Sequence, residues 1–174
     1  MRYKTIQFLG VARIKNNTTT QQHARTYKEM ISHGLSSDEL QNIEERLIEE
    51  RSRAYCPYSK FHVGCVLFIR GSTEPYICGC NVENASFGGT ICAERVAMLK
   101  AISNDCKEGW TALAIIGDTI GSPDKVITPC GMCRQVMSEF IKDMETFPIL
   151  MYSSDLKKLQ VTNMNELMPM PFDL

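Results

Sequence analysis

The chain carries two stretches that decide how its fold and chemistry are interpreted, Cys92-Ala93-Glu94 and Pro129-Cys130-Gly131-Met132-Cys133. Cys130 and Cys133 are three residues apart, so in the first turn of a helix their sulfur atoms would face the same side and could bind one ion. Cys92, at the expected start of a second helix, would add a third sulfur. Free N–H groups and the positive end of the dipole at both helix starts favour thiolate over thiol. The two stretches therefore predict a zinc site.

The number of ligands indicates what kind of zinc site this is. Three protein ligands rather than four are typical of a catalytic centre, because the fourth position is left open for water. Glu94, beside the first ligand, is a carboxylate that can take a proton from such a water and pass it on. Cys78 or Cys80 could instead supply a fourth thiolate and close the site into a structural one. That alternative would leave Glu94 without a role beside the metal, so the sequence favours an open site.

These residues lie within blocks of sequence that resemble the small homotetrameric cytidine deaminases, in the variant that has Cys92 where many members have histidine. The blocks are Cys56-Pro57-Tyr58-Ser59-Lys60-Phe61, Gly79-Cys80-Asn81-Val82-Glu83-Asn84-Ala85, Cys92-Ala93-Glu94-Arg95 and Cys130-Gly131-Met132-Cys133-Arg134-Gln135. The resemblance extends over residues 37 to 172. It implies zinc-dependent hydrolysis of free cytidine and 2′-deoxycytidine to uridine and 2′-deoxyuridine, with release of ammonia, in pyrimidine salvage.

The resemblance also implies roles for the residues around the metal. One Zn²⁺ per chain would be bound by Cys92, Cys130 and Cys133, and Glu94 would carry protons first to ring N3 and then to the leaving ammonia. Three thiolates exceed the charge of Zn²⁺ by one unit, so a compensating cation is expected close by. The residues that the resemblance places in hydrogen-bonding range of the ligand sulfurs are Arg95 and Gln135. Without the resemblance, Arg95 would be interpreted as a surface residue of a helix.

Substrate contacts are implied by the resemblance at residues that would otherwise have ordinary structural interpretations. The ribose hydroxyls are assigned to Asn81 and Glu83, and the nucleoside is expected to lie against Phe61 and Ala93. Phe61 alone would be interpreted as a core residue. Phe172, in the proline-rich ending, would reach a cytosine ring bound in another subunit of a homotetramer. The alternative is that this terminal aromatic packs on its own domain or is frayed.

Length and charge narrow the classes of function. A chain of 174 residues, 44% of them hydrophobic, is long enough to form one domain with its own core. Its formal net charge of −1 provides no basic field for a polyanion, so a small-molecule substrate is favoured over nucleic acid. Three alternatives stay open: a deaminase of a polynucleotide, a deaminase of a nucleoside antibiotic, and a non-catalytic zinc-binding interaction protein.

The N-terminal part of the chain differs in composition from the rest. Residues 1–28 contain six Lys or Arg and no acidic residue before Glu29, which predicts a flexible basic extension over residues 1–35 followed by the deaminase domain over residues 36–174. No apolar run is long enough for a membrane span, and no secretory signal is evident. We therefore expect a cytoplasmic protein without membrane contact, with a mitochondrial transit peptide as the weaker alternative for the basic segment.

Sequence patterns predict the secondary structure of this domain. Ser36 and Glu39 form a capping box that opens a helix ending near Arg53. A continuous apolar run at 111–117 is typical of a strand that is buried on both faces. The remaining predictions are a hairpin at 63–69 and 76–81, helices at 92–103, 130–142 and 164–168, and a strand at 148–153. This order predicts an α/β fold, a three-layer α/β/α sandwich with a mixed sheet like that of the cytidine deaminases.

Overall fold

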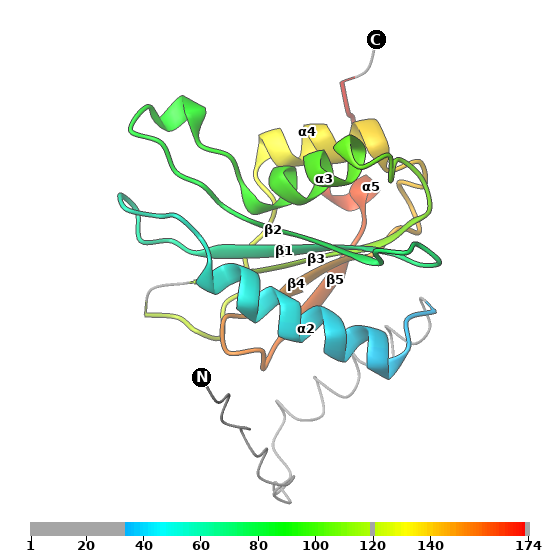
Figure 1. Cartoon of the computed structure of the whole chain (residues 1–174), viewed down its shortest axis with the longest axis horizontal. Helices are drawn as coiled ribbons and strands as arrows, with labels where there is room; N and C mark the ends of the chain where they lie inside the picture. The colour runs from blue at the N-terminus through cyan, green and yellow to red at the C-terminus, as the bar shows by residue number, and fades with distance from the viewer. Residues whose placement is uncertain (1–33, 119–120, 173–174) are drawn as a thin grey trace, which may run out of the picture.

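A computed structural model describes residues 34–118 and 121–172 of the chain (Figure 1). Most of the predicted N-terminal extension, including the segment considered as a transit peptide, lies outside the described residues. In chain order the elements are α2 (Ser37–Ser52), β1 (Val63–Ile69), β2 (Tyr76–Cys80), the short 3-10 helix η1 (Phe87–Gly89), α3 (Ala93–Ser103), β3 (Trp110–Gly117), α4 (Gly131–Phe140), β4 (Ile149–Tyr152), β5 (Leu159–Thr162) and α5 (Met164–Leu167).

One mixed sheet organises these elements. Its strands follow the order β2-β1-β3-β4-β5, with β3 and β4 parallel and the other neighbouring pairs antiparallel. Helix α2 covers one face, whereas α3, α4 and α5 cover the other (Figure 1). The predicted three-layer α/β/α sandwich with a mixed sheet is therefore confirmed. Among the described helices, none is long and apolar enough to cross a membrane.

Strand β1, in the centre of the sheet, does not alternate between apolar and polar residues. All its residues are buried, because helices cover both faces of the sheet. Cys65 and Leu67 face the core beneath α3 and α4, whereas Val66 and Phe68 face the core beneath α2. Strand β3, which pairs with β1, is buried in the same way over its last six residues. The strands nearest the functional helices are thus held by two separate cores.

Helix α2 begins as the sequence predicts. The Ser36 hydroxyl accepts a hydrogen bond from the backbone N–H of Glu39, whose carboxylate accepts one from the N–H of Ser36. The buried stripe of the helix consists of Leu40, Ile43 and Leu47, together with Glu50 at its end. Leu35, just before the cap, is only 1% exposed and packs in the same core. The packed chain therefore includes a residue that the sequence assigned to the extension.

Strand β5 and the end of helix α4 differ from the sequence-based prediction. Strand β5 was not expected, because its four residues include the exposed Gln160 and show no clear pattern; pairing with the buried strand β4 is what makes it a strand. Helix α4 ends at Phe140 rather than near Lys142, since Ile141 has extended backbone angles and is only 3% exposed. Burial of Ile141 in the core thus stops the helix before its sequence pattern does.

Helix α3 lies unusually close to the sheet at Gly79 of β2. A Cβ atom at this position would lie 2.5 Å from the carbonyl oxygen of Ala93 and 2.6 Å from the amide nitrogen of Ala97, both in the backbone of α3. Backbone atoms of a helix cannot move individually, so the whole helix would have to shift. Glycine at position 79 therefore sets the height of α3, and of Cys92 at its start, above the sheet.

This close approach gives a stability prediction. Gly79→Ala should lower the free energy of unfolding by about 1–3 kcal/mol, because it overpacks the contact between α3 and the sheet. It should also reduce the zinc content, since Cys92 immediately precedes the displaced helix. Chemical denaturation and metal analysis measure the two effects. Gly88→Ala is the matched control, because nothing lies within 4 Å of the added methyl group; a similar loss in the control would contradict the packing argument.

Candidate metal centre and substrate site

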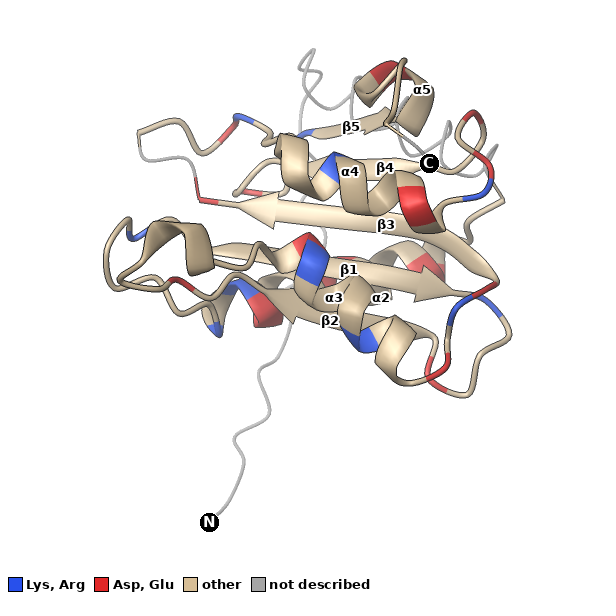
Figure 2. Cartoon of the chain, turned by 90° about the horizontal axis from the view of Figure 1, so that it is seen from above, with Lys and Arg blue, Asp and Glu red and all other residues tan. Residues whose placement is uncertain are grey.

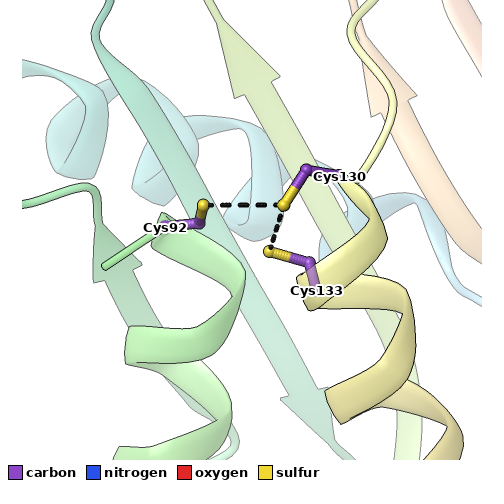
Figure 3. A group of neighbouring side chains, drawn as sticks. All are labelled: Cys92, Cys130 and Cys133. Atoms are coloured by element: carbon purple, nitrogen blue, oxygen red, sulfur yellow. Dashed lines mark hydrogen bonds between the residues drawn. The ribbon is translucent and has the colours of Figure 1, made fainter. Parts of the chain in front are cut away.

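Three cysteine side chains meet where α3 and α4 begin, side by side on one face of the sheet (Figure 3). Cys92 and Cys130 are the N-cap residues of α3 and α4, and Cys133 lies in the first turn of α4. Their sulfur atoms are 3.8 Å apart between Cys92 and Cys130 and 3.5 Å apart between Cys130 and Cys133. All three sulfurs lie within 4.8 Å of one another. The structure therefore brings together the three residues that the sequence assigned as ligands.

These distances fit zinc. With Zn–S bonds of about 2.3 Å in tetrahedral geometry, two ligand sulfurs should lie about 3.8 Å apart. Within residues 34–118 and 121–172, no other group of three His, Cys, Asp or Glu residues has this arrangement, and neither Cys78 nor Cys80 belongs to the group. The described part of the chain thus supplies three ligands and no fourth thiolate. This donor set leaves one coordination position open, as in catalytic zinc sites.

The environment of the cluster favours the thiolate form of Cys92. The pKa of Cys92 is lowered because its sulfur accepts a hydrogen bond from the thiol of Cys133 and faces the guanidinium of Arg95, and these effects outweigh partial burial. The same hydrogen bond, together with burial, raises the pKa of Cys133, which is the donor. Arg95 places Nη2 at 3.8 Å from the Cys92 sulfur and at 2.9 Å from the carbonyl oxygen of Thr90. A cation therefore lies beside the Cys92 sulfur, where it can balance the excess negative charge of three thiolates on one zinc ion.

Glu94 lies in the first turn of α3, two residues after Cys92, and is 4% exposed. Burial raises its pKa to about 7, with a smaller increase from the Cys92 thiolate. A bound divalent cation would act in the opposite direction. A buried carboxylate that titrates near neutral pH can both accept and donate a proton, which suits it to acid–base chemistry.

Asn81 and Glu83 follow strand β2, and both hold the preceding loop 56–62. The Asn81 amide donates from Nδ2 to the carbonyl oxygen of Phe61 and accepts at Oδ1 from the N–H of Val63, each at 2.8 Å. The Glu83 carboxylate accepts from the N–H of Tyr58 at 2.9 Å and from the hydroxyl and N–H of Ser59. The hydrogen bond from Ser59 lowers the pKa of Glu83, which keeps the carboxylate ionised at neutral pH.

Phe61 and Ala93, the other two residues expected to contact the substrate, differ in their exposure. Phe61 is half-buried and packs against the same core as Cys92. Ala93 is 0% exposed and presents no accessible surface to a substrate, because its helix turn lies directly against Gly79. Ser59 and Arg134 also have roles at this site that the sequence did not predict, although both lie inside the quoted blocks. The sequence does not reveal the hydrogen-bond partner of a serine hydroxyl or an arginine guanidinium, because that partner is set by the folded chain.

The C-terminal tail is tied to the metal-binding helix. Arg134 donates from Nε to the carbonyl oxygen of Pro129 at 2.9 Å and from Nη1 to that of Leu167 at 2.7 Å. Gln135, expected near the ligand sulfurs, instead donates from Nε2 to the carbonyl oxygen of Phe172 at 2.9 Å. The side chain of Phe172 is 67% exposed, and the last described residues leave the body on the side of α4 and α5 (Figure 1).

A three-layer α/β/α domain with an open centre of three cysteines and an adjacent buried glutamate defines the class of zinc-dependent deaminases. Residues 37–148 match the family described as the cytidine and deoxycytidylate deaminase zinc-binding region. The chain belongs to this family, and zinc is its metal.

Individual relatives agree with this assignment. The chain is 40% identical over 133 residues to the cytidine deaminase of Sporosarcina psychrophila, an alignment that covers 74% of this chain and 90% of that protein. It is 32% identical over 117 residues to the blasticidin-S deaminase of Bacillus cereus, covering 66% of this chain and 79% of that protein. The crystal structure of cytidine deaminase from Burkholderia pseudomallei superimposes with a TM-score of 0.67 at 34% identity, covering 79% of this chain and 100% of that chain.

The ligand assignment predicts how zinc content responds to substitution. Cys92→Ala should lose most of the bound zinc, because two thiolates cannot replace a three-sulfur site. Cys80→Ala should keep one zinc per chain, since Cys80 lies outside the cluster. Metal analysis of the purified variants measures both. Retention of zinc by Cys92→Ala together with its loss from Cys80→Ala would show that the ligands are wrongly assigned.

Proposed function

We propose that this chain deaminates free cytidine and 2′-deoxycytidine by hydrolysis, with Glu94 as its catalytic acid and base, and that it serves pyrimidine salvage. The observation that carries the proposal is the position of Glu94. Glu94 is 4% exposed and lies two residues after Cys92, whose sulfur lies within 4.8 Å of two other cysteine sulfurs. A closed structural zinc site or a non-catalytic interaction protein has no use for a buried acid that titrates near neutral pH at this point.

The residues of the chain would act in the following way. Zinc, when bound by Cys92, Cys130 and Cys133, supplies a Lewis acid that brings the pKa of a water ligand down toward about 7. Glu94 takes a proton from the attacking water and delivers it to ring N3 as the water oxygen adds to C4. Glu94 then takes the proton of the new C4 hydroxyl and delivers it to the amine. The C4–N bond breaks, ammonia leaves, and the base becomes uracil.

Recognition of the sugar is proposed for Asn81 and Glu83. Both are 8% exposed, and Glu83 is kept ionised by its hydrogen bonds, so a ribose hydroxyl would find a fixed acceptor. A site built around such a group rejects ligands that lack the hydroxyl, because its own polar group is then left without a partner. Phe61, which belongs to the loop that these two residues hold, would pack against the nucleoside.

Two other substrates are less well supported. A polynucleotide would need a basic surface, yet the chain has 19 Lys or Arg against 20 Asp or Glu. Figure 2 shows the two signs of charge interspersed over the described residues. A nucleoside antibiotic is favoured less than cytidine, because identity to the blasticidin-S deaminase is 32% against 40% for a cytidine deaminase.

The activity is tested with purified, zinc-loaded protein, by ammonia release and by loss of cytidine absorbance. Glu94→Gln should keep the fold and the zinc while kcat falls by roughly 10²–10⁴-fold, because the amide fills the same volume and cannot transfer protons. KM should change far less than kcat. Blasticidin S and a single-stranded oligonucleotide serve as comparison substrates. Faster turnover of either, or a normal rate in Glu94→Gln, would refute the proposal.

We also propose that the protein is a homotetramer whose active sites are completed by neighbouring subunits. A shallow surface groove along α3 supports a protein interface, because four of its six lining residues are apolar and one of them, Leu99, is 52% exposed. The groove is lined by Ile91, Val96, Leu99 and Ile102, together with Lys100 and Ser103. Phe172, 67% exposed at the end of the tail, supports a side chain that acts in another subunit. A cytoplasmic location is proposed because none of the eight cysteines forms a disulfide.

The tetramer and the shared site are tested separately. Mass measurement in solution should give four chains per particle. Phe172→Ala should weaken cytidine binding without changing that mass, whereas Met170→Ala, at a residue that is 90% exposed in the same tail, should have little effect on either. A fully active monomer would exclude the tetramer. A tetramer that is indifferent to Phe172→Ala would exclude only the shared site.

A further inference from the structure

The loop between α2 and β1 is fastened to the segment that follows β2. Backbone hydrogen bonds run from the N–H of Tyr55 to the carbonyl oxygen of Asn81 at 3.0 Å and from the N–H of Glu83 to the carbonyl oxygen of Tyr55 at 2.8 Å. The side chains of Asn81 and Glu83 add the contacts described above. The two residues to which sugar binding is assigned are therefore built into the support of the loop that carries Phe61.

Ser59 lies at the centre of these contacts. Its hydroxyl donates to Oε1 of Glu83 and accepts from the backbone N–H of Phe61 at 3.0 Å. Its own N–H donates to Oε2 of Glu83 at 3.2 Å. The Ser59 hydroxyl thus connects the carboxylate of Glu83, which is proposed to bind the ribose, with the backbone of Phe61, which is proposed to pack against the nucleoside.

The backbone of this loop requires such support. Lys60, between Ser59 and Phe61, has a φ of +59°, in the left-handed region that is unfavourable for a residue with a side chain. A conformation of this kind persists only where surrounding contacts hold it, and such residues cluster at functional sites. The Ser59 hydroxyl provides two of these contacts. It holds Ser59, before Lys60, to Glu83, and it accepts a hydrogen bond from the N–H of Phe61, after Lys60.

We propose that Ser59 is a positioning residue for the sugar side of the substrate, because its hydroxyl holds the Glu83 carboxylate and the Phe61 backbone in one fixed arrangement. The inference rests on the proposed function, since it requires Glu83 to hold a ribose hydroxyl. Ser59 itself does not need to touch the substrate. Its effect should therefore depend on whether the substrate carries the hydroxyl that Glu83 binds.

Ser59→Ala removes the donor to Glu83 and the acceptor for Phe61. We expect kcat/KM for cytidine to fall roughly tenfold, mostly through KM, as for the loss of a hydrogen bond to a charged group. With 2′,3′-dideoxycytidine, which has no ribose hydroxyl for Glu83, the change should stay within about twofold. Ser59→Thr should restore the activity on cytidine, because it keeps the hydroxyl and position 59 is exposed enough to accept a methyl group. Ser59→Cys keeps the size but donates weakly, so it should resemble Ser59→Ala.

A double-mutant cycle supplies the decisive control. In a Glu83→Gln background, Ser59→Ala should cause little further loss on cytidine, since the two residues act through one contact. Zinc content should match that of the parent enzyme, because Ser59 lies outside the metal cluster. Equal losses on both substrates, independent losses in the cycle, or no loss at all would each overturn the role of Ser59. If the parent enzyme itself failed to distinguish cytidine from 2′,3′-dideoxycytidine, the proposed sugar role of Glu83 would fail instead, and the inference with it.

Discussion

The structure depends on holding three cysteine sulfurs together at the N-termini of two neighbouring helices. Thiolates at this spacing repel one another, and the free N–H groups of the helix starts, the Arg95 guanidinium and a bound zinc ion oppose that repulsion. Neither helix could supply the site alone, because Cys92 begins α3 whereas Cys130 and Cys133 begin α4. Metal binding and the packing of both helices on the sheet are therefore energetically linked.

The segment that leaves strand β2 connects the residues proposed for sugar binding with the cysteine cluster. It first supplies Asn81 and Glu83, which hold the loop of Phe61, and then continues to Cys92 and Glu94. The height of α3 above the sheet is set by Gly79 in the same strand. A displacement of β2 would therefore move Asn81 and Glu83 together with Cys92 and Glu94, so this strand keeps the two groups of polar residues at a fixed relative position.

Helix α4 connects the metal site with the C-terminal tail. Arg134 bridges the carbonyl oxygen of Pro129, next to the ligand Cys130, and that of Leu167 at the end of α5. The tail thus starts from a fixed point beside the metal ligands, although Phe172 at its end is largely exposed. A fixed origin with an exposed aromatic end is the arrangement that the proposed action of Phe172 in a neighbouring subunit would require.

The sequence by itself predicted the three cysteines that the fold brings together, the capping box of α2, the α-helices, four of the five strands and the layer order, because these depend on local spacing, burial pattern and turn residues. Only the tertiary structure decided the rest. Strand β5 exists through its pairing with β4, and the full burial of Ala93 follows from the close approach of its helix to Gly79. The hydrogen bonds from Ser59 to Glu83 and from Gln135 to the tail join residues far apart in the chain. Such contacts depend on where the folded backbone brings each polar group, which no local pattern encodes.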